Sequence, residues 1–221
     1  MERYRVGLEL LGPVDGKRVL DAGCGFGTLQ QFIPAVGVDR HLKNLARAKA
    51  GPTAKTLIAA RLSSIPFPDA HFDDCLMLET LEHVEEESRV LAEIYRVLKR
   101  GGRLILSVPH HRWLYNFIDL EHWLVPLISG RPVHRHYKKK YLFQKLAAAG
   151  FRIEDSLERG MLIAACMRWC YAPFDLCDYF RIGSFNGPCG RGIRRLFDRF
   201  VDWEFNRNTN WGGTLFVVAR K

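Results

Sequence analysis

One acidic residue stands beside three alternating glycines near the start of the chain. In the stretch VLDAGCGFGTL, Asp21 precedes Gly23, Gly25 and Gly27. A glycine-rich turn between a strand and a helix lets a ligand approach the backbone closely and presents amide N–H groups to it. The spacing differs from the G-x-G-x-x-G of dinucleotide-binding turns and lacks the Gly-Lys-Ser/Thr of a phosphate-binding loop. The glycines alone therefore predict a turn that binds a ligand, or a structural tight turn.

The two carboxylates around these glycines narrow the choice of ligand. Asp21 would repel a pyrophosphate but attract a ligand that carries an ammonium group. Asp39 comes 18 residues later, at the end of a second apolar segment, where it suits the two hydroxyl groups of a ribose. An ammonium group and a ribose without phosphate describe S-adenosylmethionine, which we expect as the cofactor, with S-adenosylhomocysteine as its product. The alternative role for Asp39 is a helix N-cap.

The elements that must position these residues alternate between strand and helix. Apolar runs predict strands at residues 18–23, 35–40, 56–60, 72–79, 103–109, 152–158 and 213–221. Helical spacing predicts helices at residues 2–12, 41–50, 86–99 and 138–150, and the start of another at 28–33. Glycine after basic residues is expected to end the helix at 86–99. Strands that are apolar almost throughout indicate a parallel sheet covered by helices on both faces, which binds ligands beyond the carboxyl ends of its strands.

Five stretches occur in the order and spacing of the class I S-adenosylmethionine-dependent methyltransferases: VLDAGCGFG, VGVDR, IPFPDAHFD, LEHV and RVLKRGGRLILSVP. Residues 15–110 resemble this family, and most of all the methyltransferase type 11 group that includes the ubiquinone and menaquinone enzymes. The resemblance implies an α/β fold, a Rossmann-like class I methyltransferase sheet of seven mostly parallel strands flanked by helices. FRIEDSL and TLFVVAR would form its antiparallel edge pair, with a helical insertion before the last strand.

The resemblance also implies which residues bind the cofactor. Asp21 would hold the methionine ammonium group, Asp39 would take the ribose hydroxyls, and Arg40 would flank the adenine. Arg61 departs from the family, which usually has an acid there to accept from the adenine amino group; Arg61 would stack on the ring instead. The expected cofactor-binding residues are Asp21, Gly23, Cys24, Gly25, Asp39, Arg40, Arg61, Leu62 and Glu79. No metal ligands are expected.

Groups that act on the methyl acceptor are expected after the fourth and fifth strands. Methyl transfer from a sulfonium is an in-line displacement, and it needs a base only where the acceptor must lose a proton. The candidate catalytic residues are Glu79, His83, His110 and His111. The residues expected to contact the substrate are His134, Arg135, His136 and Tyr137. The alternatives are a structural role for His83, at the start of a helix, and a solvated loop for His110 and His111. His134, Arg135 and His136 suit anion binding as much as a role as bases.

The C-terminal half carries most of the positive charge and an unusual insertion. Residues 111–221 contribute +8 of the net charge of +9. Residues 160–180 are strongly apolar but interrupted by charges, and RGIRRLFDRF is a basic amphipathic pattern. We interpret residues 1–221 as a single domain with an active-site lid at 110–137 and a helical cap at 160–211. Residues 160–200 would contact an anionic membrane surface, or would only cover the site or a dimer interface.

The leading hypothesis is a methyltransferase for a small, hydrophobic or lipid-linked acceptor. RNA or protein methylation is the second interpretation, although nucleic acid is disfavoured because no Asn/Asp-Pro-Pro-Tyr/Phe motif follows the fourth strand. The third is a degenerate methyltransferase fold kept for binding or assembly, which Arg61 would support. The six cysteines lack CxxC spacing, and neither a signal peptide nor an apolar run of about 18 residues is visible. We therefore expect reduced thiols in a cytoplasmic protein, or one peripheral at the membrane; an oligomer is compatible with the sequence.

Overall fold

The computed structural model describes residues 2–50, 56–111, 135–160, 199, 203 and 212–221. The chain divides into two compact units. The first comprises residues 1–108, 139–156 and 216–221, and the second comprises residues 109–138 and 157–215. The predicted lid and cap fall mostly outside the described residues, as does the predicted amphipathic helix apart from Arg199. The assignment of a single domain with two insertions therefore stays a prediction.

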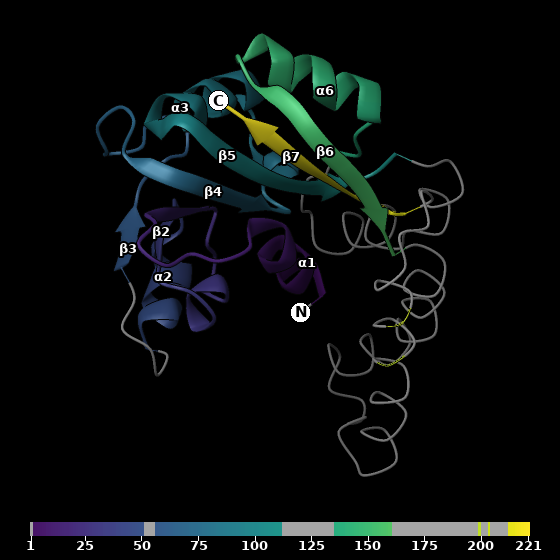
Figure 1. Ribbon diagram of the computed structural model, residues 1–221. Helices are drawn as coiled ribbons and strands as arrows, with labels where there is room; N and C mark the ends of the chain where they lie inside the picture. The colour runs from purple at the N-terminus through teal and green to yellow at the C-terminus, as the bar shows by residue number, and fades with distance from the viewer. Residues whose placement is uncertain (1, 51–55, 112–134, 161–198, 200–202, 204–211) are drawn as a thin grey trace. The chain divides into compact units, whose positions relative to one another are not determined.

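Seven strands form one mixed sheet in the order β3-β2-β1-β4-β5-β7-β6 (Figure 1). The strands are β1 Val19–Ala22, β2 Ala35–Asp39, β3 Thr56–Ala59, β4 Phe72–Leu78, β5 Leu98–Pro109, β6 Arg152–Arg159 and β7 Thr214–Arg220. The first five pair in parallel, and β7 runs antiparallel to its neighbours β5 and β6. The N–H of Gly101 donates to the carbonyl of Lys221 at 3.0 Å, which fixes the register of β7 on β5. The predicted seven-stranded class I sheet is confirmed.

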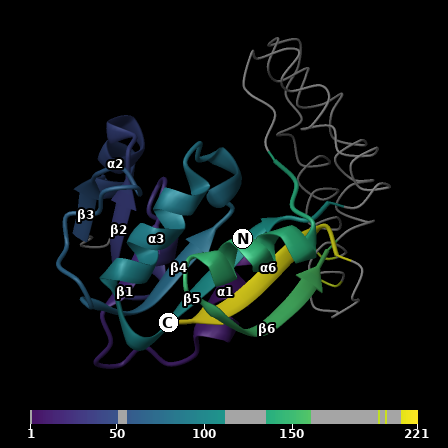
Figure 2. The ribbon, with the colours of Figure 1, turned by 90° about the horizontal axis from the view of Figure 1, so that it is seen from above.

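Helices cover both faces of the sheet, as its apolar strands require. The helices are α1 Glu2–Leu11, α2 Leu42–Lys49, α3 Glu87–Val97 and α6 Lys139–Ala148. Figures 1 and 2 show α1 and α2 on one face and α3 and α6 on the other. In α3, the side chains that recur every three or four residues are buried, among them Val90, Leu91 and Ile94. This packing holds the carboxyl ends of β1, β2 and β4 in fixed positions.

The helix predicted to begin at residues 28–33 is wrong beyond its first turn. Only a 3-10 turn, η1 at Leu29–Gln31, forms there. The N–H groups of Phe32 and Ile33 both donate to the carbonyl of Leu29, at 2.9 and 3.2 Å. Pro34 then has no N–H to continue a helix, and β2 begins at the next residue. Because β2 begins at Ala35, the short stretch of chain before it can form only a single helical turn.

The prediction that glycine ends the helix at 86–99 is also wrong. Helix α3 ends at Val97, and β5 begins at Leu98, which pairs with Phe72. Two residues further along β4, Asp74 pairs with Arg103, so the glycines lie in a bulge of β5. Leu98 pairs with β4, and the backbone of Gly101 and Gly102 bonds to Lys221, so the helix stops before the glycines are reached.

Two of the six cysteines, Cys24 and Cys75, lie in the described residues and are buried free thiols, as predicted for them. The other four cysteines lie outside the described residues.

Where the structure describes the chain, no helix is long and apolar enough to cross a membrane. Over the same residues, no group of three or more His, Cys, Asp or Glu side chains could hold a metal ion.

Candidate functional site

The glycine turn after β1 is fastened to the end of β2. The N–H groups of Gly23 and Cys24 both donate to the carbonyl of Val38, at 2.8 and 3.1 Å. Gly23 has a φ of +83°, a left-handed conformation that favours glycine. The Sγ atom of Cys24 lies against Gly37 of β2, so this side chain belongs to the core. The turn thereby brings the ends of β1 and β2 together.

Two glycines of the turn have opposite surroundings. A Cβ atom on Gly23 would lie 2.3 Å from Cγ2 of Thr80, because the turn packs directly on the chain after β4. A Cβ atom on Gly25 would meet nothing within 4 Å. Gly23 is therefore required for packing, whereas a side chain at Gly25 would enter open space.

Asp39 receives two backbone N–H groups. Its Oδ2 atom accepts from Gly25 at 3.0 Å, and its Oδ1 atom accepts from His41 at 2.7 Å. Helix α2 begins at Leu42 with His41 as its N-cap, so the alternative of Asp39 as an N-cap is wrong. The carboxylate instead ties the glycine turn to the chain that follows β2, and its contact with a ribose stays a prediction.

Asp21 is buried in β1 beside a partner that the sequence did not reveal. Nε2 of Gln30 donates to Oδ2 of Asp21 at 3.0 Å. Gln30 passes over Gly37 of β2, where a Cβ atom would lie 2.8 Å from its Nε2. The pKa of Asp21 is raised to about 7, mainly by burial and to a smaller extent by the charge of Asp39, although the hydrogen bond from Gln30 acts to lower it. A cationic group next to this carboxyl would relieve the cost of its burial.

Binding of S-adenosylhomocysteine at pH 6 is expected to release up to one proton per site. At that pH the buried carboxyl of Asp21, with a pKa of about 7, is mostly protonated, and the ligand's ammonium group favours the ionised form. Calorimetry at pH 6 in buffers with different heats of ionisation measures the release. At pH 8, where Asp21 is already ionised, the release should vanish. Identical binding enthalpies in all buffers at pH 6 would contradict the assignment.

The residues expected around the adenine lie after β2 and β3. The N–H of Ala60 donates to the carbonyl of Asp39 at 3.1 Å, which joins the ends of these two strands. Arg61 is exposed and Leu62 is buried in the turn that follows. Arg40 is exposed, and its Nε donates to Nε2 of His41 at 3.1 Å. Their contacts with a cofactor stay predictions.

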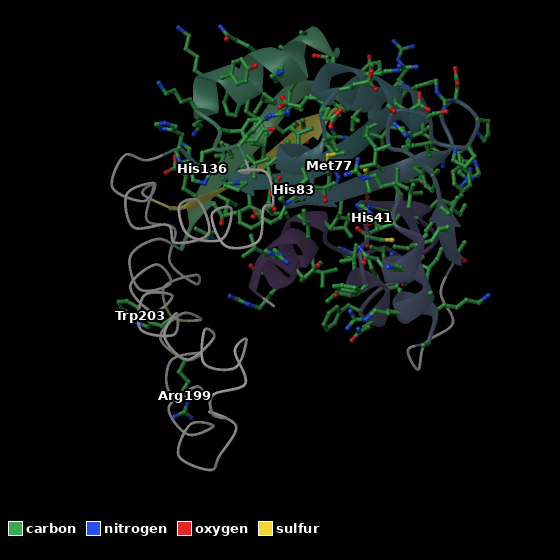
Figure 3. The ribbon with its side chains drawn as sticks, turned by 180° about the vertical axis from the view of Figure 1, so that it is seen from behind. His41, Met77, His83, His136, Arg199 and Trp203 are labelled. Atoms are coloured by element: carbon green, nitrogen blue, oxygen red, sulfur yellow. The ribbon has the colours of Figure 1, made fainter. Side chains whose placement is uncertain are left out.

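Two acids follow β4. Glu79 has a φ of +50°, and its N–H lies 3.1 Å from both the carbonyl and the hydroxyl oxygen of Ser107 in β5. The Ser107 hydroxyl donates to Oε1 of Glu79 at 3.1 Å. Glu82 is buried, which raises its pKa well above the ordinary value, and the charge of Glu79 adds to the effect. His83 is largely exposed after β4 (Figure 3), and its Nε2 lies 3.8 Å from Oε1 of Glu82.

The remaining predicted residues lie in the second unit. The structure pairs His110 with Tyr137 in an isolated parallel bridge, in which the N–H of His111 donates to the carbonyl of Tyr137 at 2.9 Å. Arg135 is exposed and His136 is half-buried, whereas His134 lies outside the described residues. His110 is buried beside Glu158 of β6, another residue that sequence reasoning missed. Glu158 is separated from His110 by 48 positions, and no local pattern marks it.

The residues of the first unit fit S-adenosylmethionine. Asp21 offers a buried carboxyl for an ammonium group, Gly25 borders open space, and Asp39 stands at the end of β2 as an acceptor for hydroxyl groups. None of these groups would favour a pyrophosphate, which Asp21 and Asp39 would repel.

Comparison with known proteins also points to a protein that uses S-adenosylmethionine. Residues 20–106 match the family described as "Methyltransferase domain". A demethylmenaquinone methyltransferase of Symbiobacterium thermophilum is 36% identical over 164 residues, which cover 65% of each chain. A malonyl-[acyl-carrier protein] O-methyltransferase of Erwinia billingiae is 35% identical over 140 residues, 61% of this chain and 53% of that protein. The chain spans about half to two thirds of the length of these relatives.

Solved structures share the fold of this chain. A S-adenosylmethionine-dependent methyltransferase from Mesorhizobium loti is 23% identical, with a TM-score of 0.66, and the match covers 100% of this chain and 98% of that one. The family and the fold imply S-adenosylmethionine as the cofactor. Residues 20–106 therefore belong to the methyltransferase domain family, and the chain has the fold of the class I S-adenosylmethionine-dependent methyltransferases.

Proposed function

We propose that the chain transfers a methyl group from S-adenosylmethionine to a small acceptor that is hydrophobic or lipid-linked. The observation that carries the proposal is the arrangement of Asp21, Gly25 and Asp39 at the ends of β1 and β2. When bound, the cofactor supplies an electrophilic methyl carbon on a positively charged sulfur. Asp21 would bind the ammonium group, Asp39 would accept from the ribose hydroxyls, and Gly25 would allow the close approach.

The class of acceptor is supported by relatives and by charge. The relatives named above are described as acting on demethylmenaquinone and on a malonyl group carried by a protein. The basic C-terminal half, with its apolar segment at 160–180, suits an acceptor that has an apolar part and an anionic part. Contact of residues 160–200 with an anionic membrane surface belongs to the same proposal.

The groups that would act on the acceptor are those predicted after β4 and β5. Glu79 and His83 follow β4, and His110 and His111 follow β5. Residues 134–137 would contact the substrate, and Tyr137 pairs with His110. Whichever of these groups removes a proton must lie within hydrogen-bond reach of the acceptor atom.

The fold alone does not decide the activity, so the test must follow the methyl group. A structure described as a [4+2]-cyclase shares the fold at 21% identity, with a TM-score of 0.64. We expect purified protein to bind S-adenosylmethionine in calorimetry and to form S-adenosylhomocysteine when a demethylated quinone or a malonyl thioester is added. RNA and protein substrates should give none. Asp15→Ala removes an exposed carboxylate from the turn before β1, outside the proposed cofactor site. This control variant should bind the cofactor and transfer the methyl group as the wild type does.

Two outcomes would overturn the proposal in different ways. Failure of both S-adenosylmethionine and S-adenosylhomocysteine to bind would support the degenerate fold. Binding of both, with methyl transfer only to RNA or protein, would support the second interpretation of the sequence.

A further inference from the structure

A cleft of about 500 Å³ lies at the amino ends of the parallel strands of the first unit. The first residues of four strands line it: Val19, Ala35, Thr56 and Phe72. Its volume falls within the range of small-molecule binding sites. The glycine turn and Asp39 follow the carboxyl ends of β1 and β2. The cleft therefore lies at the other end of these strands from the residues proposed to bind the cofactor.

Arg18 supplies a positive charge at the wall of the cleft. In the described residues no carboxylate forms an ion pair with its guanidinium, whose Nη1 lies 3.5 Å from Nδ1 of His71. Lys17, the other cation in the lining, is bound to Asp74 at 3.1 Å. An exposed guanidinium without a carboxylate partner is available to an anion, and its planar fork matches a carboxylate.

The carboxylate nearest to Arg18 is held by other groups. Asp73 accepts from Nζ of Lys99 and, at 2.9 Å, from the backbone N–H of Arg18, and these hydrogen bonds lower its pKa. The pKa of His71 is also lowered, first by burial and then by the charges of Arg18 and Lys99. At His71 these two positive charges outweigh the carboxylate of Asp73. This wall of the cleft therefore favours a negatively charged group.

Gln30 lines the cleft and has one unsatisfied polar atom. The residue is 5% exposed, and its Oε1 atom has no hydrogen-bond donor among the described residues. A buried acceptor without a donor costs free energy, so a ligand that donates to Oε1 is stabilised there. On the same amide, Nε2 donates to Oδ2 of Asp21 at 3.0 Å. One side chain therefore links the cleft to a residue proposed to bind the cofactor.

The other walls of the cleft are largely apolar. Phe32 is 51% exposed, although it is one of the larger apolar side chains, and Pro34 is exposed beside it. Val36 is the one half-buried residue of β2, whose other residues are buried. Phe72 adds a second aromatic ring. Such walls suit the flat apolar body of an aromatic ligand.

We propose that this cleft binds a small aromatic carboxylate, with the anionic group at Arg18 and an N–H or O–H of the ligand at Oε1 of Gln30, and that Gln30 couples its occupation to Asp21. A donor at Oε1 polarises the amide and strengthens the hydrogen bond from Nε2, which favours the ionised form of Asp21. The other titratable groups that interact with Asp21 in the described residues are Asp39 and Cys75. Since the ionised carboxylate attracts an ammonium group, cleft ligand and cofactor strengthen each other's binding.

The first test measures binding to the cleft without cofactor. Indole-3-acetate combines a carboxylate, a flat apolar ring system and an N–H, and we expect a dissociation constant of about 1 mM or lower. In ¹H–¹⁵N spectra it should shift the side-chain amide signals of Gln30, which are assigned by their loss in Gln30→Met. Indole-3-acetamide, which is neutral, and 1-methylindole-3-acetate, which lacks the N–H, should each bind about fivefold more weakly or worse.

A pair of arginine variants makes this test specific. Arg18→Ala should weaken the binding of indole-3-acetate about tenfold, because the proposed partner of its carboxylate is removed. Arg89→Ala removes the same side chain from an exposed position of α3 and should bind as the wild type does. Both arginines are exposed, so the variants should unfold at the same denaturant concentration as the wild type. Equal binding by Arg18→Ala and the wild type, or unshifted signals of Gln30, would overturn the site.

The second test measures the coupling, which rests on the proposed role of Asp21 in binding the cofactor. At pH 6, where Asp21 is mostly protonated, saturating indole-3-acetate should tighten the calorimetric binding of S-adenosylhomocysteine about two- to threefold. At pH 8 the gain should vanish, because Asp21 is already ionised. Equal affinity at pH 6 with and without indole-3-acetate would overturn the coupling. Failure of the wild type to bind S-adenosylhomocysteine at all would instead overturn the proposed function.

Discussion

Replacing Asp39 with alanine is expected to weaken the binding of S-adenosylhomocysteine by about 100-fold or more. The carboxylate accepts from the N–H groups of Gly25 and His41, and it would also accept from the ribose. Hydrogen bonds to a charged group contribute about 1.5–3 kcal/mol each, and about 1.4 kcal/mol changes a dissociation constant tenfold. Asp39→Ala would lose the two hydrogen bonds expected from the ribose hydroxyl groups, and it would also release the glycine turn from the end of β2. Together these losses give the expected decrease in affinity. Calorimetric titration measures it.

Two further variants make this result specific. Asp39→Asn keeps the shape and one acceptor oxygen, so its affinity should fall between those of the wild type and Asp39→Ala. Asp15→Ala removes the same charge from an exposed turn and should bind as the wild type does. If Asp39→Ala binds within about threefold of the wild type, the ribose does not lie at this carboxylate.

Replacing Gly23 with alanine is expected to lower the free energy of unfolding by about 3 kcal/mol or more. The new Cβ atom would lie 2.3 Å from Cγ2 and 2.5 Å from Oγ1 of Thr80, and the φ of +83° is unfavourable for alanine. Since the turn is bonded to the carbonyl of Val38, it cannot move away without losing these hydrogen bonds. Denaturant unfolding in the absence of cofactor measures the loss.

Gly25 provides the matched control within the same turn. Its φ is +51°, and a Cβ atom there would meet nothing within 4 Å, so Gly25→Ala should cost only about 1 kcal/mol of stability. It should nevertheless weaken cofactor binding, because the methyl group enters the space proposed for the ligand. Adding Thr80→Ala to Gly23→Ala should recover part of the lost stability. Equal destabilisation by the two glycine variants would show that the contact with Thr80 is not what constrains Gly23.

Periodicity and local motifs predicted most of the sheet. The apolar runs in β1, β2, β4 and the second half of β5 are nearly continuous, because most of these residues are buried on both faces of the sheet. The two failures lie where long-range pairing overrode local preference. The chain at 28–33 forms one turn because β2 begins so soon, and α3 gives way to β5 before its glycines.

Part of the candidate site could likewise be predicted from local sequence, and part depends on contacts between distant segments. Sequence by itself determined the type of ligand, because Asp21, Gly23, Gly25 and Asp39 lie within 19 consecutive residues and their chemistry is local. Only the tertiary structure could show that Gln30 reaches over Gly37 to Asp21, and that Glu158 approaches His110 from a strand 48 residues away. Such contacts depend on which strands become neighbours in the sheet. They also depend on how strongly burial increases the electrostatic interactions between the side chains of these strands. A linear pattern records neither.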